Sequence, residues 1–119
     1  MGEMREILFR GKAKHSNRWA FGYYVVTLNG VHFIKNDNFN EVIPETVGQY
    51  TGLTDKNGTK IFEGDILHAA QGDFVVRWSE SICSFVAGEK EKMQPCMNSG
   101  TMKHCEVIGN IHDNPELLE

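Results

Sequence analysis

The sequence predicts an all-β fold, in the form of a small SH3-like barrel preceded by an N-terminal β-hairpin extension. Apolar residues alternate with a period of two in several short segments, and turns rich in glycine and asparagine separate those segments. No segment has the i, i+3, i+4, i+7 apolar spacing of a long amphipathic helix. At 119 residues we expect one domain over 1–119, with subdomains at 1–45 for the hairpin and 46–119 for the barrel.

The N-terminal part is expected to contain a short strand and a long loop around the hairpin. Residues 4–10 alternate well enough for a strand that places Ile7 and Phe9 on one face. Residues 36–46 are rich in turn formers, and Pro44 disfavours helical geometry before it. We therefore predict a loop there and a junction between the two subdomains.

The hairpin is predicted over residues 19–35. Residues 19–28 alternate as a strand, and Asn29-Gly30 favours a two-residue turn into a returning strand at 31–35. That turn would place Val26 opposite Phe33 and leave both faces apolar. Such a hairpin is either enclosed by the fold or covered by a second subunit, because a large exposed apolar patch is unfavourable in a monomer.

The second half of the chain reads as a series of strands joined by tight turns. A polar loop is expected over 88–100, and a one-turn helix is expected to start at Pro115 with Asn114 as its cap. The predicted strands are 47–53, 60–68 with a sharp glycine turn, 74–78, 82–86 and 104–112.

Composition and charge exclude several classes of protein. Apolar residues make up 40% and charged residues 24%, which is typical of a globular chain. No apolar run is long enough for a membrane span and no secretory signal is present, so we expect a soluble protein of the cytoplasm. The odd number of cysteines, Cys83, Cys96 and Cys105, suits a reducing compartment.

Three blocks stand in a recognisable order: residues 5–10, residues 49–66 from Gln49 to Ile66, and residues 106–118 with Val-Ile-Gly-Asn-Ile at their centre. The chain resembles the YopX family of phage and prophage proteins. The resemblance implies a phage or prophage gene, a mainly β fold and self-association, and it brings no established activity. From the residues themselves, the blocks supply turns and core, and we interpret as structural Gln49, Tyr50, Thr51, Gly52, Asp55, Gly58, Gly64, Asp65, Gly109 and Asn110.

Two arrangements would make the protein a hydrolase or a metal-dependent enzyme. In the first, Asp55, Glu63 and Asp65 would gather as an acidic site, which requires the fold to bring them together. In the second, zinc would be bound by Cys or His side chains near the C-terminus, but their spacing does not match a zinc motif. Those side chains are Cys96, His104, Cys105 and His112.

The strongest candidate site is the basic N-terminal segment. Residues 1–20 carry a net charge of +3, whereas the other 99 residues carry −7. Single-stranded nucleic acid is bound where cations pair with phosphates and aromatic rings stack on bases, and this segment has both kinds of side chain. The competing interpretation is a core face of alternating aromatic residues with a solvated basic edge. The residues concerned are Arg5, Arg10, Lys12, Lys14, Arg18 and Trp19, followed by Phe21 and Tyr23.

The chain lacks a nucleophile elbow and a phosphate-binding glycine loop, so we predict a protein that is not an enzyme and needs no cofactor or metal. The leading prediction is a self-associating module that binds a host or phage protein. Nucleic-acid binding through the basic segment is the alternative, and a metal-dependent enzyme is the second alternative.

Overall fold

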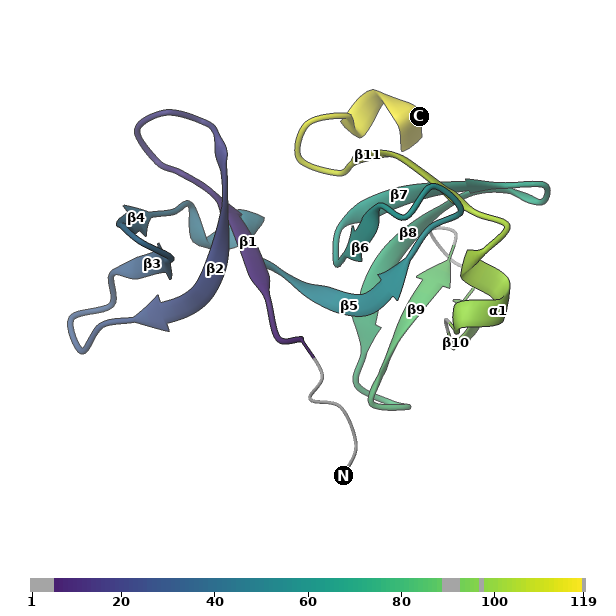
Figure 1. Ribbon diagram of the computed structural model, residues 1–119, viewed down its shortest axis with the longest axis horizontal. Helices are drawn as coiled ribbons and strands as arrows, with labels where there is room; N and C mark the ends of the chain where they lie inside the picture. Colours follow the sequence, from purple (N-terminus) through teal and green to yellow (C-terminus); the bar gives the residue numbers. More distant parts are fainter. Residues whose placement is uncertain (1–5, 89–92, 97, 119) are drawn as a thin grey trace. The chain divides into compact units, whose positions relative to one another are not determined.

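The computed structural model describes residues 6–88, 93–96 and 98–118, with side chains described in 6–88 and 98–118 (Figure 1). The predicted all-β class is confirmed. The described strands form two antiparallel sheets, and the small barrel expected over 46–119 does not close. The elements are β1 Phe9–Lys12, β2 Trp19–Val26, β3 His32–Lys35, β4 Phe39–Glu41, η1 Pro44–Thr46, β5 Gly48–Thr54, β6 Lys60–Phe62, β7 Asp65–Ala69, β8 Gly72–Ser79, β9 Ser84–Gly88, β10 Met93–Cys96, α1 Ser99–Met102, β11 Glu106–Asn110 and η2 Pro115–Leu118.

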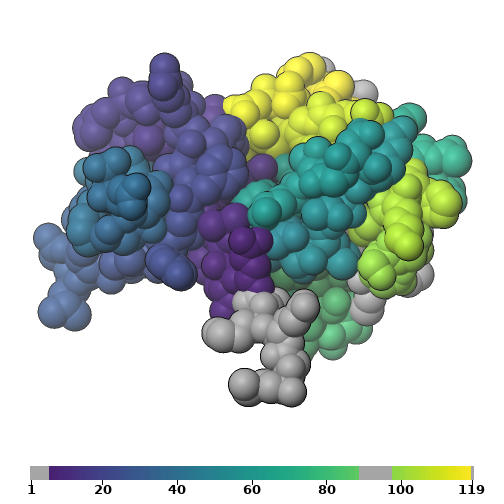
Figure 2. Space-filling view, in the orientation of Figure 1, coloured from purple at the N-terminus to yellow at the C-terminus, as the bar shows by residue number. Residues whose placement is uncertain are grey.

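The chain divides into two compact units, residues 1–50 and 51–119. In the first unit the strand order is β4-β3-β2-β1, and the start of β5 pairs with β1. One side of this sheet is its core, where Ile34 and Val42 are 0% and 2% exposed. Figure 2 draws this unit in purple to blue and the second unit in teal to yellow.

The hairpin forms with a register one residue away from the predicted one. Val26 pairs with His32, and Val25 pairs with Phe33. The turn uses three residues: the Gly30 N–H donates to the Thr27 carbonyl at 2.9 Å, and Gly30 has a φ of +82°. A type I turn followed by a left-handed glycine is the usual three-residue hairpin, and it explains the shift from the expected Asn-Gly turn.

Two other expectations for the first unit are wrong. Its first described strand is Phe9–Lys12, and Ile7 lies before it with 51% exposure, while residues 4 and 5 lie outside the described part. The predicted loop at 36–46 contains β4 and the 3-10 helix η1. The residues before Asn40 are mostly turn formers, but the pairing of Ile34 with Asn40 places this segment in the sheet.

The second unit has the strand order β10-β9-β8-β7-β11, and the later part of β5 runs beside β6. Its core cluster has Leu67 and Ile61 at 0% exposure, with Val76 at 1%. The predicted polar loop at 88–100 contains β10 and the start of α1, which Asn98 caps through the Thr101 N–H. The predicted helical turn at Pro115 is present. The Asn114 side chain, which was expected to cap it, instead accepts a hydrogen bond from the Asn110 backbone N–H of β11.

Within the described part of the chain, no helix is both long and apolar enough to cross a membrane.

Candidate functional site

One side of the β1–β4 sheet carries a row of aromatic and cationic side chains, which we call the aromatic face. Alternate residues of a strand project to the same side, and directly paired residues of antiparallel strands share that side. Arg10 pairs with Phe21 and Lys12 pairs with Trp19. Tyr23 pairs with Lys35, which in turn pairs with Phe39. The aromatic face is therefore formed by Arg10, Lys12, Trp19, Phe21, Tyr23, Phe33, Lys35 and Phe39.

The rings of this face are open to solvent. Tyr23 is 68% exposed, Phe39 64% and Phe21 45%, whereas Trp19 is half-buried. The opposite side of β2 is the packed one, because the Tyr24 ring lies 5.8 Å from that of Phe9 between their centroids. The interpretation of Phe21 and Tyr23 as a core face is thus wrong.

Cationic groups lie over the rings at both ends of the aromatic face. The Arg10 guanidinium carbon is 4.6 Å from the Trp19 ring centroid, and the Lys12 Nζ is 5.7 Å from it. At the far end, the Lys35 Nζ lies 5.0 Å from the centroid of Phe39. Charges held over aromatic rings at these distances are stabilised by the ring quadrupole. The face therefore offers apolar stacking surfaces with positive charge fixed beside them.

The structure brings together only part of the predicted basic segment. Arg10, Lys12 and Trp19 meet on the aromatic face, whereas the Lys14 ammonium pairs with the Glu41 carboxylate at 3.4 Å. Arg18 is exposed at the turn before β2, and Arg5 lies outside the described residues. Sequence reasoning missed the far end of the face, Lys35 with Phe33 and Phe39. The alternation of residues 33, 35, 39 and 41 around a short turn was the available signal.

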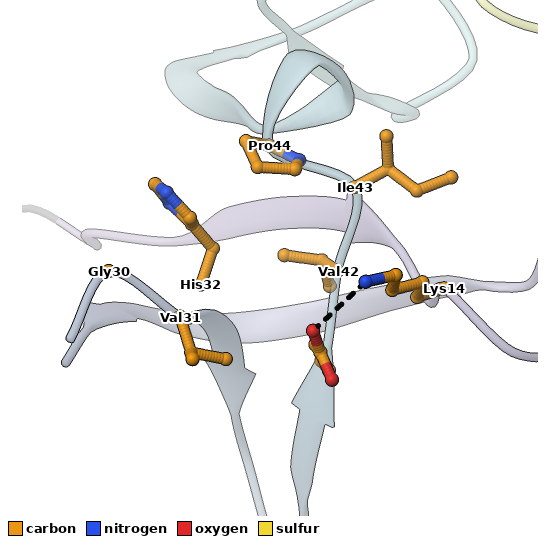
Figure 3. Close-up of a pocket in the computed structure, with 8 residues that line it drawn as sticks. Lys14, Gly30, Val31, His32, Val42, Ile43 and Pro44 are labelled. Carbon is orange, nitrogen blue, oxygen red and sulfur yellow. Dashed lines mark hydrogen bonds and ion pairs between the residues drawn. The ribbon is translucent and has the colours of Figure 1, made fainter.

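A small cavity of about 220 Å³ lies elsewhere in the first unit (Figure 3). It is lined by Lys14, His32 and Glu41, together with the apolar Val42 and Pro44. The volume is below the roughly 300 Å³ at which ligand pockets begin. Its polar groups are already engaged, since Lys14 pairs with Glu41 and the His32 ring bonds the Tyr24 hydroxyl.

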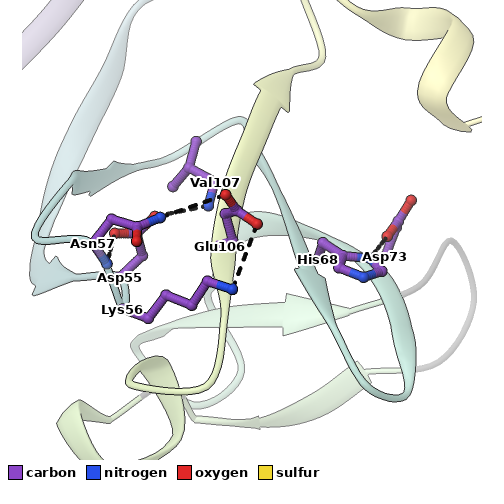
Figure 4. Close-up of polar contacts among 7 residues, drawn as sticks. All are labelled: Asp55, Lys56, Asn57, His68, Asp73, Glu106 and Val107. Atoms are coloured by element: carbon purple, nitrogen blue, oxygen red, sulfur yellow. Dashed lines mark hydrogen bonds and ion pairs between the residues drawn. The ribbon is translucent and has the colours of Figure 1, made fainter.

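In the second unit, the Asp55 carboxylate ties a turn to β11 (Figure 4). It accepts hydrogen bonds from the backbone N–H groups of Asn57 at 2.8 Å, Thr59 at 2.9 Å and Val107 at 2.9 Å. Burial alone would raise the pKa of Asp55, but these donors, led by Val107, and the charge of Lys56 lower it below its ordinary value. Asp55 is 6% exposed, so this carboxylate is a buried structural anion.

The other predicted acid and metal groups are dispersed. Asp65, 2% exposed, accepts from the Phe62 N–H at 2.7 Å across the turn that contains Glu63. Cys105 is buried, and burial together with the negative charge of Asp55 raises the pKa of its thiol. Among the side chains at 6–88 and 98–118, no three His, Cys, Asp or Glu residues lie close enough to hold a metal ion, and the Cys96 side chain is outside this set.

The fold and the aromatic face define an all-β protein with an open sheet surface. The chain belongs to the YopX family, because the family described as YopX protein matches residues 3–119. None of the curated proteins compared with the chain matches it. The crystal structure of protein EF1440 from Enterococcus faecalis is similar, with a TM-score of 0.67 and 23% identity, and the alignment covers 98% of this chain and 100% of that chain. At that identity the likeness shows a shared fold.

Proposed function

We propose that this phage or prophage protein is a non-enzymatic module of the host cytoplasm that binds another macromolecule through its aromatic face. One observation carries the proposal: Phe21, Tyr23 and Phe39 are exposed together on one side of a hydrogen-bonded sheet. Exposed apolar clusters of this kind mark interaction surfaces, and aromatic anchors dominate the energy of such surfaces. The sheet backbone holds the rings in place, so little ordering of the backbone opposes binding.

In this proposal the buried carboxylates of the second unit have a structural role and take no part in binding. Asp55 and Asp65 both accept backbone hydrogen bonds within the second unit, which gives them a structural task. Their positions in the family-matching blocks are explained by the turns that they hold.

Affinity purification from host lysate tests the proposal. The tagged wild-type chain is compared with a Tyr23→Ser/Phe39→Ser double variant and with Trp78→Ser, which removes an aromatic ring that is 46% exposed in the second unit. We expect a macromolecule to be recovered with the wild type and Trp78→Ser, and to be lost with the double variant. Equal recovery by all three proteins would contradict the assignment of the face.

Self-association is the second part of the proposal, and it rests on the end of the hairpin. Leu28 is fully exposed and Val26 is 50% exposed beside it. A second copy would remove these apolar groups from water. We expect light scattering to show an oligomer that Leu28→Ser weakens, whereas a monomer over a wide concentration range would contradict this part.

A further inference from the structure

We infer that the macromolecule bound by the aromatic face is a single-stranded nucleic acid, an inference that rests on the proposed function of that face. Single strands are bound by surfaces that combine exposed aromatic rings, on which bases stack, with cations that meet the phosphates. The face supplies both kinds of group, and each of its cations is paired with an aromatic residue of a neighbouring strand.

The charge of the face matches a polyanion, although the charge of the whole chain does not. The chain has a formal net charge of −4, and residues 51–119 carry eleven acidic side chains against six basic ones. By contrast, Arg10, Lys12 and Lys35 all project on the aromatic face, and because Arg10 is buried at 8% exposure, Lys12 and Lys35 are the cations that can meet a phosphate. The carboxylate that pairs into the same side, Glu41, is held by Lys14 at 3.4 Å. A local positive surface on an acidic protein restricts phosphate binding to this face.

The spacing of the rings favours a single strand over a duplex. Residues two apart on a strand are separated by roughly 6.6–6.8 Å, and adjacent strands by about 4.8 Å. Phe21 and Tyr23 follow that spacing along β2, and Phe39 lies two strands across from Tyr23. Bases stacked within a duplex follow one another at about 3.4 Å and have no free faces. Rings with the wider spacing receive bases that are already unstacked.

A second copy of the chain is a poor occupant of the same face. A two-fold dimer would place each aromatic face against itself, because such an interface uses the same patch on both subunits. Both apposed surfaces would then carry the cations Arg10, Lys12 and Lys35, so the like charge of the two faces opposes their association. Lysine is also depleted at the centre of protein interfaces, whereas here Lys35 lies over Phe39 at 5.0 Å.

The binding test uses a fluorescein-labelled thymidine 20-mer and the full chain, with fluorescence anisotropy as the measurement. We expect saturable binding at low salt, at least tenfold tighter than binding of a 20-base-pair duplex. Each exposed ring is expected to stack on one base and so to contribute to the affinity. Tyr23→Ser and Phe39→Ser are therefore each expected to weaken binding about tenfold. Trp78→Ser is the aromatic control and should leave the affinity within twofold of the wild type.

Salt dependence tests the cations separately. Two phosphate contacts, by Lys12 and Lys35, predict a slope of log K against log salt of about −1.4 for a single strand. Lys35→Gln should reduce the magnitude of this slope by about 0.7. The matched control is Lys103→Gln, which removes an exposed cation from the second unit and should leave the slope unchanged. Thermal melts of every variant establish that it is folded.

A tryptophan signal locates the bound strand. The chain has two tryptophans, so Trp78→Phe leaves Trp19 as the single reporter. We expect the unlabelled 20-mer to quench Trp19 emission over the concentration range in which anisotropy rises. A uridine 20-mer in the same assay distinguishes RNA from DNA, and binding of either supports the inference.

Two results would overturn the inference. One is the absence of oligonucleotide binding by the folded wild type at low salt; the other is binding that Tyr23→Ser and Phe39→Ser leave unchanged. If the lysate partner nevertheless disappears with the double variant and survives nuclease, the face binds a protein and only the nucleic-acid inference fails. If the partner is recovered equally by all variants, the proposed function itself fails.

Discussion

Replacing Asp55 with asparagine is expected to destabilise the second unit strongly, although the substitution barely changes the side chain's shape. The carboxylate accepts three backbone hydrogen bonds, two through Oδ1 from Asn57 and Thr59 and one through Oδ2 from Val107. Asparagine keeps one acceptor oxygen, so its amide NH₂ would face an N–H donor. At the Val107 end, 52 positions along the chain, the substitution therefore sets two donors against each other.

The magnitude follows from the hydrogen bonds that are lost. A hydrogen bond to a charged group contributes about 1.5–3 kcal/mol, and a part-buried donor left without its acceptor costs a similar amount. The turn donors of Asn57 and Thr59 keep a neutral acceptor and lose only the charge. We therefore expect Asp55→Asn to lower the free energy of unfolding by about 2 kcal/mol. For a domain of this size the melting temperature falls by about 10 °C.

Thermal unfolding followed by circular dichroism measures this effect, with Asp37→Asn as the matched control because Asp37 is exposed in a loop of the first unit. The folded-state pKa of Asp55 lies below its ordinary value of 3.8, so its contribution is fully present above that pH and is lost as the pH falls below it. The difference between wild type and Asp55→Asn should therefore narrow below about pH 4. An Asp55→Asn protein that melts within about 2 °C of the wild type at pH 7 would show that the carboxylate does not anchor β11.

Three further experiments test the packing and the thiol accessibility of the second unit. Gly109→Ala would place its Cβ 2.5 Å from the Asn114 Oδ1, so we expect a loss of about 1–2 kcal/mol in a chemical denaturation experiment, and Asn114→Ala should recover part of it in the double variant because only the Asn114 Cβ, at 3.1 Å, stays close. Leu67→Ala removes a side chain with 0% exposure from the core, and a loss of about 3 kcal/mol is expected in the same experiment. Cys83 is exposed, whereas Cys105 is buried with a raised pKa, so Cys83→Ser should remove a fast phase of thiol labelling that Cys105→Ser leaves unchanged. Labelling kinetics that respond to Cys105 instead would show that this thiol is accessible.

The sequence allowed the described strands of the second unit other than β10 to be located within a few residues, because their alternation and glycine turns act locally. It failed where pairing partners override local preference. The segment that contains β4 looks like a loop by composition, yet Phe39 pairs with Lys35 across a short turn and extends the sheet. The Asn29-Gly30 pair favours a two-residue turn, and the three-residue turn that forms instead changes every pairing along β3.

The candidate site was predictable in part for the same reason. A period of two shows that Trp19, Phe21 and Tyr23 share one side of β2, but it does not show which side meets solvent. Both sides of β2 carry apolar residues, and the burial of Ile34 and Val42 decides that the opposite side is the core. The turn bonds of Asp55 can be inferred from nearby residues, whereas its bond to Val107 depends on the tertiary fold.

The position of β11 in its sheet has a consequence for how the protein is made on the ribosome. β11 pairs with β7, and of the strands in that sheet it is synthesised last. Until residues 106–110 emerge, β7 presents an unpaired edge and Asp55 lacks its Val107 donor. Strands β1 to β4 need no residue beyond the first unit for their mutual pairing. The N-terminal sheet can therefore form during translation, while the second unit completes its sheet only near the end of synthesis.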